Sequence, residues 1–164
     1  MEIRTFKDMY IAEVQELASV ARQLGEYLPR VADAASHPAL KKAIIENKED
    51  TESQMERLEA ILETHGAEVD AHTDQAMQAM VSETEKMLPM LRGRELRDAG
   101  LIASIQRLKH YQIAAYGTAA ALAGQLRLRD DQDVLLGSLE EERIADMELT
   151  SVAEQEVNPD AVAA

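Results

Sequence analysis

The feature that most constrains the fold is an apolar stripe near the N-terminus that recurs in steps of four and three residues. Such steps place side chains on one face of an α-helix. Thr5, with Asp8 three residues later, is suited to cap the start of that helix. The stripe holds through three seven-residue repeats, and its positions are Tyr10, Val14, Leu17, Ala21, Leu24, Leu28 and Val31. The sequence therefore predicts a long amphipathic helix from about residue 6.

Comparable patterns predict three further long helices, over about 38–65, 95–128 and 131–153. Ser36 is suited to cap the first of these three, and Pro38 suits its first turn. A shorter helix is expected over about 73–90, within the connection between the second and third long helices. Short connections join the first two and the last two long helices, as in two antiparallel hairpins.

The predicted fold class is therefore all-α: a ferritin-like up-down four-helix bundle with a short extra helix in the crossover. Residues 1–156 are expected to form a single domain. Residues 157–164 are expected to form a frayed C-terminal tail.

Composition supports helices and excludes several classes of protein. Aromatic residues are 3% of the chain, with only 7 Gly and 4 Pro. The absence of Cys excludes a disulfide scaffold, a thiol nucleophile, an iron–sulfur cluster and Cys-type zinc. The net charge of −14 argues against nucleic acid or an anionic membrane as a partner. No apolar stretch is long enough to span a membrane and no signal peptide is evident, so a cytoplasmic protein is expected.

Carboxylates fall where the helices are expected to face one another. Glu142 and Asp146 are four residues apart on the predicted inward face of the fourth long helix. Glu49 and Glu52 are three residues apart, near or on the predicted inward face of the second. Several buried carboxylates must be neutralised, because buried like charges are costly. Helical bundles do this by binding metal, and such oxygen-rich sites suit iron or manganese.

A bundle without any site is the alternative interpretation, because Glu-x-x-Glu occurs in any acidic helix. The chain contains no Glu-x-x-His, the usual partner motif in such sites. His110 is the only His in the middle of a predicted helix, beside Lys109 and close to Gln112. Lys109 and Gln112 are both expected to face the interior.

Several blocks of sequence then stand out together: 6–10, 51–59, 97–103, 106–118 and 139–143, followed by Asp146. The most specific is 106–118, which reads Gln-Arg-x-x-His-Tyr-x-Ile-Ala-x-Tyr-Gly-Thr. Through these blocks the chain resembles the YciF-like family of ferritin-like bacterial stress proteins over nearly its whole length. The resemblance implies a cytoplasmic homodimer, linked to stress responses, with a two-metal carboxylate site in the bundle centre.

The residues that match this site depart from the family pattern at three positions. Ala21 stands where the family has Glu on the first helix. Lys109 and Gln112 stand where the family has Glu on the third long helix. These changes make the layer more positive by about four charges, as much as two divalent ions would supply. They therefore offset the loss of both metals.

The leading hypothesis is a stress-associated, non-catalytic protein without a cofactor or an identified small-molecule substrate. In it, Lys109 donates its ammonium to Glu52, Glu142 or Asp146 in a metal-free ion-pair layer. The alternative is a carboxylate-bridged iron or manganese protein with ferroxidase-, peroxidase- or catalase-like activity. Its metal ligands would be Glu49, Glu52, Glu142 and Asp146, with His110 as a further candidate. A third possibility is that the dimer interface is the function and the layer only sets the register of the helices.

Overall fold

The computed structural model describes residues 2–164, and it is all-helical over its regular elements. Four helices are long, and their positions agree with the four predicted ones. The elements in chain order are α1 (Phe6–Ala34), α2 (Pro38–Thr64), α3 (Gln75–Met87), the 3₁₀ turn η1 (Leu88–Met90), α4 (Arg94–Gln125), α5 (Arg129–Val152), the π-helical turn η2 (Ala153–Val157) and α6 (Asn158–Ala163).

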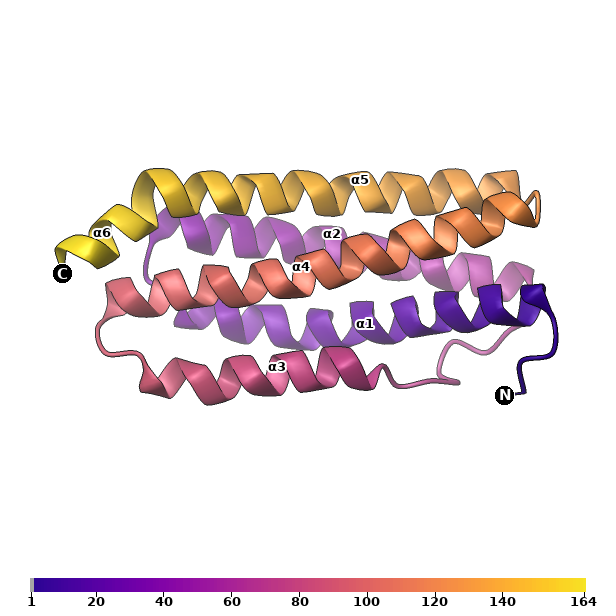
Figure 1. The fold of residues 1–164 in the computed structure, drawn as a ribbon, viewed down its shortest axis with the longest axis horizontal. Helices are drawn as coiled ribbons and strands as arrows, with labels where there is room; N and C mark the ends of the chain where they lie inside the picture. The colour runs from indigo at the N-terminus through magenta and orange to yellow at the C-terminus, as the bar shows by residue number, and fades with distance from the viewer. Residues whose placement is uncertain (1) are drawn as a thin grey trace.

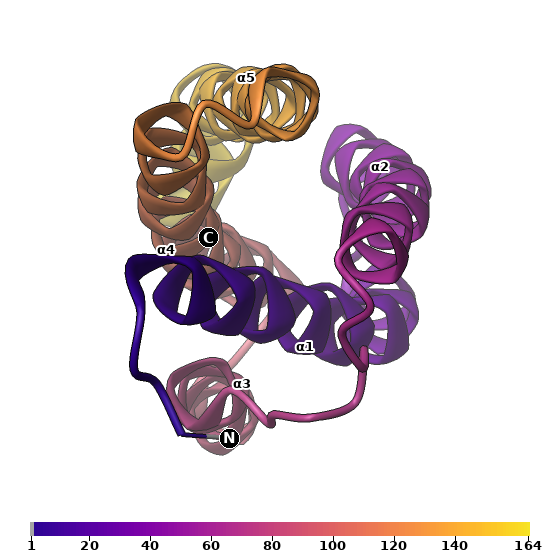
Figure 2. The same cartoon turned by 90° about the vertical axis from the view of Figure 1, so that its right-hand side faces the viewer.

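The four long helices lie side by side along the long axis of the molecule (Figure 1). Seen down that axis, they are ordered α1, α2, α5 and α4 around the interior, and α3 lies outside α1 and α4 (Figure 2). The helices α2 and α4 run in the same direction, so the chain must return along the molecule between them. The helix α3 makes this return, which explains the long crossover.

The first two helices begin in different ways. The predicted cap of α1 is confirmed: the Thr5 Oγ1 accepts from the Asp8 backbone N–H at 3.1 Å, and an Asp8 oxygen accepts from the Thr5 N–H at 2.9 Å. The predicted side-chain cap at Ser36 is wrong. Instead, the backbone N–H groups of Ser36 and His37 donate to the buried carboxylate of Asp98 in α4, at 2.8 and 2.9 Å. The start of α2 is therefore fixed by α4.

Buried apolar side chains form two clusters, one at each end of the long helices. The first contains Leu24, Leu28, Ile44, Leu101, Ile105, Leu108 and Leu149, among others. The second contains Val14, Leu17, Leu58, Leu62, Tyr116, Leu135 and Leu139, among others. Between the two, the buried positions of α2, α4 and α5 are polar. The apolar core is thus divided by a polar layer near the middle of the molecule.

The C-terminal segment differs from the predicted frayed tail, because the helical path continues through η2 and α6 to Ala163. Val157 is buried in the first apolar cluster. It lies four residues after Ala153, which lies four after Leu149, so the buried stripe of α5 extends past its end. In the part of the chain that the structure describes, no helix is long and apolar enough to cross a membrane.

Candidate functional site

The centre of the polar layer is an ion pair between α4 and α5. The Lys109 Nζ lies 2.7 Å from the Glu142 Oε2, and both side chains are only 1% exposed. The leading hypothesis named Glu52, Glu142 or Asp146 as the partner of Lys109. In the structure the partner is Glu142. Two charges removed from water are tolerated when they are paired at this distance.

The α2 side of the layer is formed by Asn47, Thr51 and Gln54, all buried. The Thr51 hydroxyl donates to the Asn47 backbone carbonyl at 2.8 Å. Across the interior, the Tyr116 hydroxyl donates to the Gln54 Oε1 at 3.2 Å. Burial raises the pKa of Tyr116, and the nearby negative charge of Glu142 raises it further. Tyr116 therefore stays neutral and serves as a hydrogen-bond donor.

Five polar side-chain atoms of the layer have no hydrogen-bond partner among the described residues. They are both polar atoms of Asn47, both of Gln112, and the Glu142 Oε1. Buried polar groups normally bond to protein or to ordered water. The layer therefore holds more hydrogen-bonding capacity than its own side chains use, which distinguishes it from an ordinary apolar core.

The four candidate metal ligands do not come together. Glu142 is buried, and the Asp146 carboxylate is 17% exposed, 3.1 Å from the His110 Nε2. The prediction that Glu49 and Glu52 face inward is wrong, because both are exposed. Glu52 pairs with Lys48 of its own helix at 2.6 Å. Among residues 2–164, no group of three or more His, Cys, Asp or Glu side chains is placed to hold a metal ion.

The physical reason for the error is the register of α2. Its inward stripe continues in steps of three and four residues through Leu40, Ile44, Asn47, Thr51, Gln54, Leu58 and Ile61. Glu49 and Glu52 lie off this stripe. Continuing the apolar spacing across the polar segment would have identified Asn47, Thr51 and Gln54 as the interior residues, although none of them is charged.

The three positions that depart from the family pattern do lie in the interior. Ala21, Lys109 and Gln112 are all buried, on α1 and α4. A two-metal site among these residues would need carboxylates from α1 and α4. The side chains present at the three positions are a methyl group, an ammonium and an amide. The donor set present here does not fit a two-metal carboxylate site.

A second set of polar contacts joins α2 to α5 at the edge of the layer. The Arg57 guanidinium donates to both carboxylate oxygens of Glu141, at 2.9 and 3.0 Å, and to the Ser138 hydroxyl at 2.9 Å. Gln54 also donates to Glu141, at 3.2 Å. Burial raises the pKa of Asp50, and the negative charge of Glu141 raises it further. The layer is thus continuous with an acidic surface between α2 and α5.

Comparison with known proteins agrees with this architecture. YciF of Escherichia coli K12 is 34% identical over 159 residues, which are 96% of each chain. The crystal structure of that stress protein matches with a TM-score of 0.89, covering 95% of this chain and 99% of that one. YcfI of Rhodopseudomonas palustris, provisionally described as a structural protein, matches with a TM-score of 0.89 at 26% identity, covering 93% and 97%.

The family model described as a domain of unknown function, DUF892, matches residues 5–162. This match and the likeness to YciF together cover nearly the whole chain. The chain therefore belongs to the DUF892 family and is a relative of the stress protein YciF.

Proposed function

We propose that this chain is a stress-associated, non-catalytic, ferritin-like homodimeric protein whose two-metal carboxylate site is degenerate. The observation that carries the proposal is the pair of Lys109 with Glu142, at 2.7 Å and with both side chains 1% exposed. An ammonium at this distance uses the carboxylate oxygen that a metal ion would need. Its positive charge also repels a cation from the layer.

The other residues of the layer support the same reading. Of the four candidate ligands, only Glu142 is fully buried. Ala21 and Gln112 supply no carboxylate from α1 and α4. Asn47 and Thr51 occupy the interior positions of α2 and are neutral. The residues present therefore do not fit a two-metal site, and the proposed function includes no redox chemistry.

The stress-related part of the proposal comes from the likeness to YciF, which is described as a stress protein. The homodimer and the cytoplasmic location are carried over from the family resemblance. Light scattering of the purified protein tests the dimer, and a mass of one chain would contradict it.

Metal analysis tests the degenerate site directly. The purified protein is incubated with Fe(II) without oxygen, or with Mn(II), then dialysed and analysed for metal content. We expect no tightly held ion. Two tightly held ions per chain would overturn the proposal and favour a carboxylate-bridged iron or manganese protein with ferroxidase-, peroxidase- or catalase-like activity.

A restoration experiment tests the placement of the site. The triple variant Ala21→Glu, Lys109→Glu and Gln112→Glu puts three carboxylates at buried positions of the interior that holds Glu142, and we expect it to gain metal. In the same background, Glu49→Gln with Glu52→Gln is the matched control and should leave the metal content unchanged, because both side chains are exposed. A triple variant that folds and binds no metal would contradict the placement of the site.

A further inference from the structure

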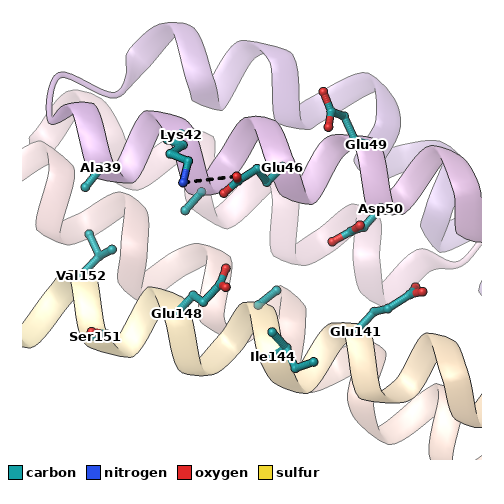
Figure 3. A pocket seen from close by; sticks show the side chains of 12 residues that line it. Ala39, Lys42, Glu46, Glu49, Asp50, Glu141, Ile144, Glu148, Ser151 and Val152 are labelled. Carbon is teal, nitrogen blue, oxygen red and sulfur yellow. Dashed lines mark ion pairs between the residues drawn. The ribbon is translucent and has the colours of Figure 1, made fainter.

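A groove runs along the outside of the molecule between α2 and α5 (Figure 3). Its volume is about 570 Å³, and it is lined by residues 39–50 of α2 and 141–152 of α5. At a rise of about 1.5 Å per residue, these stretches are about 18 Å long. The groove is therefore long enough for a helix of three turns.

The opposite side of the molecule shows how such a groove is closed. There, α3 has 13 residues and packs over α1 and α4 (Figure 2). Met77 of α3 is 0% exposed within the first apolar cluster. The Asp74 carboxylate caps α3 by accepting from the Met77 N–H at 2.6 Å, and it also accepts from the Tyr111 hydroxyl at 2.5 Å. No helix in the described residues covers the α2–α5 groove in this way.

The floor of this open groove is apolar and built from small side chains. The apolar lining residues are Ala39 and Ala43 of α2 and Ile144, Ala145 and Val152 of α5, and Ile144 is 44% exposed. Small side chains allow the backbone of another helix to approach closely, as in other helix–helix contacts. The floor thus suits a helix that presents an apolar stripe.

The walls of the groove are acidic. They carry Glu46, Glu49 and Asp50 on α2, and Glu141 and Glu148 on α5, with Lys42 as the single basic lining residue (Figure 3). Lys42 pairs with Glu46 at 3.4 Å, and Arg57 neutralises Glu141. Glu49 and Glu148 are exposed, and no cation is bonded to either among the described residues. The charge complement of these walls is a set of Lys or Arg side chains.

We propose that the α2–α5 groove is a docking site for a basic amphipathic helix of a partner protein. The apolar stripe of that helix packs on the alanine-lined floor, and its basic flanks face the carboxylates of both walls. A second copy of this chain fits less well, because a symmetric contact through the groove would bring the same carboxylates face to face. The inference is independent of whether the interior layer binds metal.

A designed peptide tests the proposal. The probe is a stapled helix of about three turns with a Leu and Ala stripe and Lys on both flanks, which matches the groove in length. The chain has no Cys, so Ser151→Cys places a unique fluorophore in the groove, and Ser82→Cys on α3 serves as the distant control. We expect saturable binding reported by the Ser151 label and no response from the Ser82 label.

Matched charge reversals separate docking from general attraction to an acidic protein. Glu46→Lys with Glu148→Lys changes both walls, whereas Glu26→Lys with Glu83→Lys makes the same change of charge on α1 and α3. We expect the wall variant to weaken binding about tenfold and the control to change it by less than about twofold. Circular dichroism confirms that both variants are folded.

Three results would overturn the proposal. The first is equal weakening by the two charge-reversal variants, which would mean attraction by net charge alone. The second is the absence of saturable binding to the folded wild-type chain. The third is concentration-dependent self-association that the wall variant changes, because it would assign the groove to a second copy of this chain.

Discussion

The two outer sides of the molecule differ in what covers them. On the α1–α4 side, α3 is fastened by a buried Met and by a capped, hydrogen-bonded N-terminus. On the α2–α5 side, the corresponding groove has an alanine floor and acidic walls, and it stays open. Residues of α2, α4 and α5 form the polar layer inside the molecule, between these two sides. The two sides therefore differ in side-chain chemistry as well as in cover: one is closed by an anchored helix, and the other exposes alanines and carboxylates.

The largest effect is expected for the polar layer between the two sides. Lys109→Met leaves Glu142 buried without its cation, which should lower the free energy of unfolding by about 3–5 kcal/mol. Urea unfolding measures this loss. The double variant Lys109→Met with Glu142→Leu should recover most of it, because no unpaired charge remains. A single variant as stable as the wild type would show that the pair is not buried as described.

On the covered side, removing the buried side chain of Met77 should strongly lower the stability of the protein. Met77→Ala removes a fully buried side chain between α3 and the core and should cost about 2–5 kcal/mol. Hydrogen exchange should show the loss concentrated in α3. Exchange that rises equally in α3 and α5 would contradict the view that Met77 mainly fastens the covering helix.

Alkaline pH should weaken the covered side and the rest of the fold together. Burial raises the pKa of all four tyrosines above the usual value, and in Tyr111 the hydrogen bond to Asp74 adds to the effect. The folded state thus favours neutral tyrosine, so this contribution to stability is fully present below about pH 10 and is lost as the pH rises above it. Absorbance near 295 nm and circular dichroism, followed together, should show that ionisation coincides with unfolding. Tyrosine ionising near pH 10 with the helices intact would contradict this.

The smallest effect is expected on the open side. Ile144→Ala shortens an exposed side chain in the groove and should change the free energy of unfolding by less than about 0.5 kcal/mol. Urea unfolding alongside Met77→Ala makes the comparison direct. A loss near that of Met77→Ala would mean that the groove is part of the core and not a free surface.

Much of the helical architecture could be predicted from sequence. The spacing from Tyr10 to Val31 gave a long α1, and Thr5 with Asp8 gave its start. These signals are local: each depends on residues within one or two turns of each other. The start of α2 could not be found this way, because its N–H groups bond to Asp98, far along the chain.

The candidate site was predicted less evenly. Lys109 and Gln112 lie on an uninterrupted stripe of α4, so their inward positions followed from spacing. In α2 the apolar stripe is interrupted by a fully polar segment. Hydrophobicity does not show which positions of that segment face the interior. The prediction for Glu49 and Glu52 depended on their charge. The residues of this segment that lie in the interior are the neutral Asn47 and Thr51. That Lys109 pairs with Glu142 and not with Asp146 depends on how α4 and α5 pack, which residue spacing alone does not determine.

The carboxylate of Asp98 has a consequence for the order of assembly. It satisfies two backbone donors of the turn between α1 and α2, although it lies about sixty residues further along the chain. As the chain leaves the ribosome, the first hairpin emerges well before this carboxylate does. Its turn therefore keeps two backbone donors in water until α4 has been synthesised and packs against it. The two hairpins are not independent folding units, since the first becomes complete only when the second begins.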